Sequence, residues 1–166
     1  MDEREKKVFD ALSAQCAKRE CCTADIRRKA LERLEWDAAA AESVVAALAS
    51  EGYVDDRRYA AAFAREKSAL SGWGPVKIRT ALLARGISRE VALDALGEID
   101  PERASAKLEK VLEAKWRTLR DDPQGRLKLI RFALSRGYDY EPLRPLISRL
   151  TSPSDSPSCD PSGDPL

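Results

Sequence analysis

Histidine is absent from the 166 residues of this sequence, and aromatic residues make up only 6% of it. Histidine is the commonest general base and metal ligand, so its absence weighs against most hydrolytic and metal chemistry. The G-x-x-x-x-G-K-[ST] phosphate loop, the G-x-S-x-G nucleophile turn and the H-E-x-x-H zinc motif are also missing. We therefore do not expect an enzyme, and we expect neither a cofactor nor a bound metal.

Long apolar runs are missing too. None approaches the roughly 20 residues that a membrane-spanning helix needs, and no signal-peptide core follows Met1. Hydrophobic residues nevertheless make up 43% of the chain and charged residues 34%, which allows an apolar core under a charged surface. We expect a cytoplasmic monomer with no membrane partner.

Cysteine is scarce. The chain has four cysteines, Cys16, Cys21, Cys22 and Cys159, and no paired C-x-x-C motif. A zinc site needs four ligands at suitable spacing, and the chain has neither histidine nor a paired C-x-x-C. We interpret the cysteines as structural thiols of a reducing compartment, not as metal ligands or a disulfide framework.

Helix-forming residues are abundant. Alanine, leucine, arginine and glutamate dominate, and no segment alternates with the period of a strand. We expect an all-α protein. Turn signals predict nine helices, at about 3–19, 24–34, 38–50, 56–70, 75–85, 88–96, 101–119, 124–136 and 140–150.

Several side chains are expected to shape these helices. Predicted N-terminal caps are Thr23, Asp37, Asp55 and Ser88. Asp55 and Asp56 could be paired catalytic carboxylates, but a helix cap whose charge favours the helix dipole explains them better. In the fourth helix, Tyr59, Phe63 and Leu70 are predicted to share one apolar face. In the ninth, Pro145 is expected to kink or shorten the helix.

One stretch of sequence occurs nearly twice. Residues 72–88 read GWGPVKIRTALLARGIS and residues 125–140 read GRLKLIRFALSRGYDY, so that Arg85-Gly86 falls on Arg136-Gly137 and Ile78 falls on Leu129. Residues 25–31, DIRRKAL, are a degenerate third copy. A unit this short cannot bury its own apolar face, so neighbouring units must stack to build a continuous core.

The repeat predicts the organisation of the whole chain. We expect three tandem three-helix repeats, at 1–52, 53–98 and 99–150, that form an elongated, curved molecule. Residues 151–166 are rich in proline, serine and aspartate, and we expect a disordered acidic tail there.

Charge is distributed unevenly along the chain. Residues 1–64 carry 11 basic and 13 acidic side chains, residues 65–150 carry 18 and 12, and residues 151–166 carry none and three. A basic half suggests an anionic partner, although an ordinary solvated surface remains the alternative. Because basic residues recur at matching places in two repeats, they could form a ladder for a repeating polyanion or acidic protein surface. The predicted contact set is Lys77, Arg79, Arg85, Arg89, Lys128, Arg131 and Arg136.

Three aromatic residues lie close to these basic positions. Trp73, Trp116 and Tyr138 could stack on nucleic-acid bases. Packing within or between the repeats explains them better, because large aromatic side chains usually contribute to cores.

Three blocks of sequence resemble the RecX family of bacterial recombination regulators. They are GYVDDRRYA at 52–60, GPVKIRTAL at 74–82 and RGI at 85–87, and the similarity extends over roughly residues 20–150. The residues that the motif marks as structural are Gly52, Tyr53, Asp55, Asp56, Tyr59, Phe63, Gly74, Pro75, Ile78, Gly86 and Gly137.

The resemblance implies a fold and a function. RecX-like proteins consist of tandem three-helix repeats. The implied function is negative regulation of the RecA recombinase: binding in the helical groove of the RecA–DNA filament and inhibition of ATPase, strand-exchange and co-protease activities. This would place the protein in homologous recombination, DNA repair and the SOS response. Single- or double-stranded DNA is a further partner to consider.

The chain departs from the family pattern in three ways. Its net charge is only +1, which argues against strong binding to free DNA. The turn after the second helix reads Arg33-Leu34-Glu35-Trp36 and lacks the Arg-Gly pair, so we expect a different turn there. The ninth helix contains Pro142 and Pro145. Two other functions stay open: a helical protein that binds DNA phosphates without RecA, and a scaffold for a protein unrelated to DNA.

Overall fold

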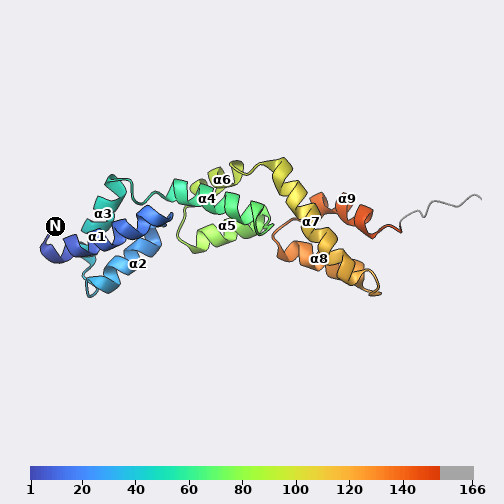
Figure 1. Ribbon diagram of the computed structural model, residues 1–166, viewed down its shortest axis with the longest axis horizontal. Helices are drawn as coiled ribbons and strands as arrows, with labels where there is room; N and C mark the ends of the chain where they lie inside the picture. Colours follow the sequence, from blue (N-terminus) through green and yellow to red (C-terminus); the bar gives the residue numbers. More distant parts are fainter. Residues whose placement is uncertain (154–166) are drawn as a thin grey trace, which may run out of the picture.

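The computed structural model describes residues 1–153 of the chain. These residues form nine α-helices and no β-strand (Figure 1): α1 (Glu3–Lys18), α2 (Thr23–Arg33), α3 (Ala38–Ser50), α4 (Asp56–Ala69), α5 (Pro75–Ala84), α6 (Arg89–Gly97), α7 (Pro101–Leu119), α8 (Gly125–Ser135) and α9 (Tyr140–Thr151). The all-α prediction and the nine predicted helices are confirmed. Residues 154–166, for which the sequence predicts a disordered tail, lie outside the described residues.

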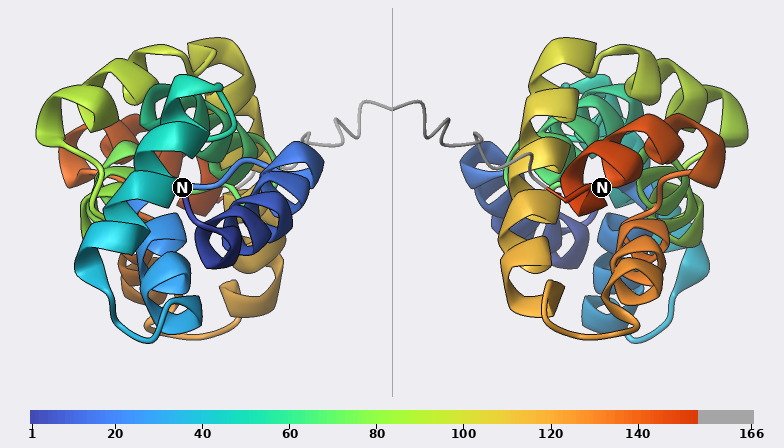
Figure 2. Two further views of the ribbon diagram at one scale, coloured as in Figure 1. Left: turned by 90° about the vertical axis from the view of Figure 1, so that its left-hand side faces the viewer. Right: turned by 90° about the vertical axis from the view of Figure 1, so that its right-hand side faces the viewer.

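The helices follow one another along an elongated molecule, which Figure 1 shows from the side and Figure 2 from its two ends. Its apolar side chains form three clusters, one for each set of three consecutive helices. Leu12, Ile78 and Leu112 are fully buried, one in each cluster. The three-helix repeats are thus confirmed, whereas their division at residues 52 and 98 stays a prediction.

Three of the four predicted caps are confirmed. The side chains of Asp37, Asp55 and Ser88 each accept a hydrogen bond from a backbone N–H in the first turn of α3, α4 and α6. The prediction for Thr23 is wrong, because α2 already begins at this residue and its N–H donates to Oδ1 of Asp56 at 2.8 Å. Asp56 belongs to α4, so the next repeat supplies the acceptor that α2 lacks.

The prediction for Leu70 is also wrong. This residue follows the end of α4 and is 71% exposed. The buried side of α4 carries Ala60 and Ala64, whose small side chains allow the neighbouring helices to approach closely. Tyr59 and Phe63 pack at the edge of this cluster, with ring centroids 6.0 Å apart.

Proline does not shorten the ninth helix. α9 runs continuously to Thr151 with Pro145 inside it. Pro142 lies in the first turn, where it was expected and where the N–H that it lacks has no partner within the helix. Pro145 is exposed, so water can solvate the carbonyl group that its missing N–H leaves without a partner.

The repeats are joined end to end through their middle helices. α2, α5 and α8 follow one another along one long edge in Figure 1, with the N-terminus of α2 next to the C-terminal end of α5 and the N-terminus of α5 next to the C-terminal end of α8. At the end of α8, the carbonyl of Arg136 accepts from the N–H of Gly74, and that of Gly137 accepts from Val76 N–H at 3.1 Å. Free N–H groups at the start of α5 thus meet free carbonyls at the end of α8, an arrangement that the helix dipoles also favour.

Glycine makes this junction, here called the second joint, possible. Gly137 has φ +89°, and an added Cβ would overlap the side chain of Lys77. A Cβ at Gly74 would overlap the carbonyl of Gly137. The two backbones are therefore too close for any side chain, which explains why the Arg-Gly pair recurs at the end of a middle helix.

The first joint has a similar plan with different bonds. Gly86, with φ +76°, ends α5 against α2, where an added Cβ would lie 3.0 Å from Cβ of Ala24. Beside it, Nε of Arg58 donates to Oε1 of Glu20 at 2.7 Å. The interaction of Asp56 with Thr23 completes this joint.

The turn after α2 differs from the others, as predicted. Instead of glycine it uses Glu35 and Trp36 in the left-handed region, with φ of 54° and 66°. Figure 1 shows the C-terminal end of α2 at one end of the described molecule, where no further helix approaches it. Without a neighbouring backbone, the chain tolerates bulky side chains at this position.

Substitution of Gly137 by alanine tests the second joint. We expect a loss of about 2–4 kcal/mol in the free energy of unfolding, because left-handed strain adds to steric overlap. Gly52→Ala is the matched control: its φ is +78°, but nothing lies within 4 Å of the added Cβ. It should cost only about 1 kcal/mol. Urea denaturation followed by circular dichroism measures both, and equal losses would contradict close backbone packing at the joint.

Candidate partner-binding surface

An exposed face is repeated on α5 and α8. We call it the outer face, and it consists of Val76, Arg79 and Leu83 on α5 and Leu127, Arg131 and Leu134 on α8. The four apolar side chains are 38%, 39%, 44% and 43% exposed, in chain order. Superposing Ile78 on Leu129 places Val76 on Leu127 and Leu83 on Leu134, so the apolar positions match. The arginines are one position out of register, because Arg79 falls on Ile130 and Arg131 falls on Thr80. Along each helix the three residues are three or four positions apart, which places them on a single stripe.

The two arginines of the outer face have no partner within the described chain. Arg79 and Arg131 are exposed, and neither forms an ion pair or side-chain hydrogen bond with another residue of 1–153. Arg89, at the start of α6, is in the same state. These three members of the predicted contact set therefore present free guanidinium groups to solvent.

Two other members of the set lie against aromatic rings. Nζ of Lys77 is 4.4 Å from the ring centroid of Trp73, and Cζ of Arg85 is 4.8 Å from that of Phe63. Lys77 is half-buried, whereas Arg85 is exposed. The aromatic faces stabilise both cations within the second repeat.

Arg136 has a structural role at the second joint. Its side chain is half-buried, and Nη1 donates to the carbonyl of Ser71 at 3.1 Å. Its guanidinium carbon lies 5.1 Å from the ring centroid of Phe132. Because Ser71 belongs to the second repeat and Phe132 to the third, Arg136 fastens the two together.

The last member, Lys128, is neutralised. Its ammonium group forms an ion pair with Asp122, and the hydrogen bond from Lys128 holds the pKa of Asp122 below its usual range. The structure thus leaves Arg79 of α5 and Arg131 of α8 exposed without a partner in residues 1–153, and it gives Lys77, Arg85, Lys128 and Arg136 partners within the chain.

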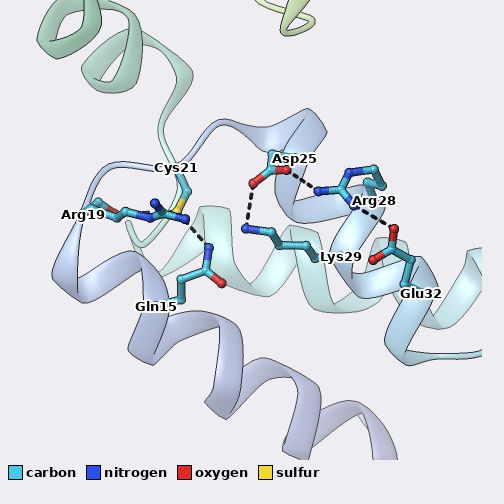
Figure 3. A network of polar contacts seen from close by, with 7 residues as sticks. All are labelled: Gln15, Arg19, Cys21, Asp25, Arg28, Lys29 and Glu32. Atoms are coloured by element: carbon cyan, nitrogen blue, oxygen red, sulfur yellow. Dashed lines mark hydrogen bonds and ion pairs between the residues drawn. The ribbon is translucent and has the colours of Figure 1, made fainter.

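In the first repeat, the equivalent helix carries cations that are already paired. Figure 3 shows Asp25 of α2 bonded to Arg28 at 2.8 Å and to Lys29 at 2.9 Å, while Arg28 also bonds Glu32 at 2.7 Å. Burial favours a raised pKa for Asp25, but the hydrogen bonds from Lys29 and Arg28 outweigh it and lower the pKa. Arg27 is paired with Glu42. Among the basic residues of α2, Arg27, Arg28 and Lys29 are thus paired, and only Arg33 at the C-terminal end is exposed without a partner within residues 1–153.

The aromatic residues near this surface pack within the protein. Trp73 lies 6.2 Å from Phe63 between ring centroids, and Trp116 contributes to the third cluster. Tyr138 is half-buried, and its hydroxyl donates to the carbonyl of Trp73 at 3.5 Å across the second joint. Burial raises the pKa of Tyr138. This favours the packing interpretation over base stacking.

The cysteines lie around the first joint. Cys16 and Cys21 belong to the first cluster and Cys22 to the second; all three are buried and free. Burial, together with Cys21, raises the pKa of Cys16 to about 12. A cleft of about 260 Å³ opens here, lined in part by Tyr59 and Arg85.

Within residues 1–153 there is no group of three or more histidine, cysteine, aspartate or glutamate side chains that could hold a metal ion. None of the helices there is long and apolar enough to cross a membrane.

Sequence reasoning missed two parts of this arrangement. The contacts of Asp56 and Arg58 with the first repeat had no signal, because both residues also fit an ordinary helix start. The exposed apolar residues of the outer face did leave a signal in the sequence. Leu83 and Leu134 match between the repeats, and they are not needed for the core, because Ile78 and Leu129 already supply the buried position.

Two family models match the chain. "RecX, second three-helix domain" matches residues 55–96, and "RecX, third three-helix domain" matches residues 102–142. A regulatory protein RecX of Chlorobium phaeobacteroides (strain BS1) is 30% identical over 150 residues, which cover 90% of this chain and 97% of that protein. The chain belongs to the RecX family.

Other RecX proteins match over shorter lengths. That of Chromohalobacter salexigens is 40% identical over 105 residues, covering 61% of this chain and 66% of the relative. That of Clostridium perfringens (strain 13) is 33% identical over 103 residues, covering 60% of this chain and 48% of the relative. The alignment thus spans about half the length of the Clostridium protein.

Solved RecX structures share the fold. The crystal structure of RecX from Lactobacillus salivarius gives a TM-score of 0.73 at 19% identity, over 90% of this chain and 98% of the other. A second crystal structure of regulatory protein RecX gives 0.75 at 20% identity, over 90% and 71%. At these identities the comparison establishes the three-repeat architecture.

Alanine substitutions separate the structural arginine from the free one. Arg136→Ala should lower the free energy of unfolding by about 1–2 kcal/mol, because it removes a hydrogen bond and a cation–π contact. Arg131→Ala, on the same helix, should stay within about 0.5 kcal/mol of the parent. Urea denaturation compares the two, and equal stabilities would contradict the role of Arg136 at the joint.

Proposed function

We propose that this protein is a negative regulator of the RecA recombinase. It binds the RecA–DNA filament in its helical groove and inhibits ATP hydrolysis, strand exchange and co-protease activity. The observation that carries the proposal is the outer face, which a member of the RecX family presents twice, on α5 and α8, in an elongated molecule.

A repeated surface suits a repeating partner. Arg79 with Leu83 on α5 and Arg131 with Leu134 on α8 offer the same combination of an apolar contact and a free positive charge. A filament presents identical subunits at regular intervals, so two such faces can bind neighbouring subunits. Linked contacts of this kind raise the apparent affinity well above that of either contact alone.

The second joint makes this arrangement effective. Backbone hydrogen bonds and close glycine packing hold α5 and α8 in a fixed relation, so the second contact forms without ordering a flexible linker. Inhibition requires in addition that the protein binds one state of the filament better than another, since a ligand shifts an equilibrium only by its differential affinity. A rigid pair of faces distinguishes filament states that differ in subunit spacing.

The first test is ATP hydrolysis by RecA on single-stranded DNA, titrated with this protein. We expect inhibition at less than one molecule per RecA, because one molecule bound to the filament acts on several subunits. Inhibition that needs a stoichiometric amount would indicate capture of free RecA or masking of the DNA. No inhibition at a several-fold excess would refute the proposal.

Charge reversal on the outer face tests the surface itself. Arg79→Glu/Arg131→Glu should raise the concentration for half-maximal inhibition at least about ten-fold, which corresponds to about 1.4 kcal/mol of binding free energy. Lys6→Glu/Lys7→Glu is the matched control, since it changes the net charge equally at two exposed residues of α1. Equal inhibition by the two double variants would show that the outer face does not bind the filament.

A further inference from the structure

A basic cleft lies between α4 and the first half of α7. It has a volume of about 410 Å³ and is lined by Ala69 of α4 and by Arg103, Ala106, Lys107 and Lys110 of α7. We call it the α7 cleft. Its three cations belong to neither the motif nor the predicted contact set. Figure 1 shows the first half of α7 above α5 and α8. None of the residues that line the α7 cleft belongs to the outer face.

The charge of the α7 cleft is not neutralised within the protein. None of its three cations forms an ion pair with another residue of 1–153, and no carboxylate lines it. On another side of α7, Glu109 binds Arg149 of α9 at 2.6 Å. Glu109, the acidic neighbour of Lys110 in the sequence, is thus paired with α9, whereas Arg103, Lys107 and Lys110 line the cleft without a partner in residues 1–153.

A smaller cleft of about 100 Å³ continues the basic track toward α4. It shares Arg103 and adds Arg65, which also has no ion-pair partner in the described chain. Glu98 and Asp100 line the same small cleft, and Asp100 caps α7 by accepting from the N–H of Glu102. The two carboxylates offset the positive charge of the smaller cleft, so the uncompensated positive charge is that of the α7 cleft, from Arg103 to Lys110.

The spacing of the cations fits a phosphate backbone. Arg103, Lys107 and Lys110 stand at i, i+4 and i+7, on one side of a helix that rises 1.5 Å per residue, so they cover about 10 Å. One strand of duplex DNA carries about three phosphates over that length, at 3.4 Å each along the axis. The stem of Lys107 is half-buried against Gly72, where an added Cβ would lie 3.6 Å from its Cγ, and this contact restricts the side chain in advance.

We propose that the α7 cleft binds the phosphodiester backbone of nucleic acid. The outer face then contacts protein and the α7 cleft contacts phosphates, so that the molecule has two separate binding surfaces. This inference does not depend on the proposed regulation of RecA, because the charges of the cleft act on free nucleic acid as well.

The test is the salt dependence of binding to DNA without RecA. The probe is a fluorescein-labelled 30-nucleotide single strand or the matching duplex, and fluorescence anisotropy is recorded from 25 to 200 mM NaCl. Arg103→Gln/Lys107→Gln/Lys110→Gln should weaken binding at the lowest salt at least about ten-fold and reduce the slope of log K against log salt by about 2. The slope falls because each phosphate that the variant no longer contacts keeps its counterion, so fewer counterions are released on binding.

The control is Arg79→Gln/Arg131→Gln, which removes the two cations of the outer face and leaves those of the α7 cleft in place. It should keep the parent slope with DNA, and thermal unfolding by circular dichroism confirms that all variants fold. The proposal is overturned if the parent protein does not bind DNA at 25 mM NaCl, or if the triple variant keeps the parent affinity and slope. It is equally overturned if polyglutamate competes as well as unlabelled DNA of the same charge, because the cleft would then bind acidic protein.

A failure of the α7-cleft proposal can be told apart from a failure of the proposed function. Inhibition of RecA is measured in a separate assay, in which the outer-face variant and the triple variant are compared directly. If the protein inhibits RecA but does not bind free DNA, the outer face stays the proposed binding surface and the α7 cleft is no longer assigned to nucleic acid.

Discussion

The contact between the end of α8 and the start of α5 determines the shape of this molecule. Carbonyl groups of Arg136 and Gly137 accept hydrogen bonds from N–H groups of Gly74 and Val76, where each helix would otherwise leave them to water. Because the two backbones approach within the space of a side chain, both glycines are required. The joint thereby connects small apolar clusters into one elongated structure.

This joint also determines which basic residues are free to bind a partner. Arg136 crosses it to reach Ser71, and Lys77 lies over Trp73 with its Cβ against Gly137. Their charges are held inside the protein. Arg79 and Arg131 are exposed and have no partner within residues 1–153. A ladder of equal basic rungs is thus replaced by one free arginine of the outer face on each of α5 and α8, Arg79 and Arg131, next to exposed apolar side chains.

The proposed function and the α7 cleft assign different chemistry to different surfaces. The outer face combines apolar contact with charge, which suits a protein subunit, since burial of apolar area drives most protein association. The α7 cleft contains free cations and no carboxylate, which suits phosphates. A regulator of a protein–DNA filament has use for both, and the rigid joint between the second and third repeats holds them at a fixed separation.

The sequence by itself determined the helices, their order and the repeat. Helices are set by local signals. Here these signals are proline at the start of a helix, glycine at its end and the apolar positions around Ile78 and Leu129. Tertiary structure alone decided that Asp56 caps α2, that Leu70 is exposed and that α9 continues through Pro145. It also decided which cations are free: whether an arginine finds an acceptor depends on residues far away in the chain, as Ser71 is from Arg136. Spacing along one helix shows which side a residue faces, but it does not show what lies there.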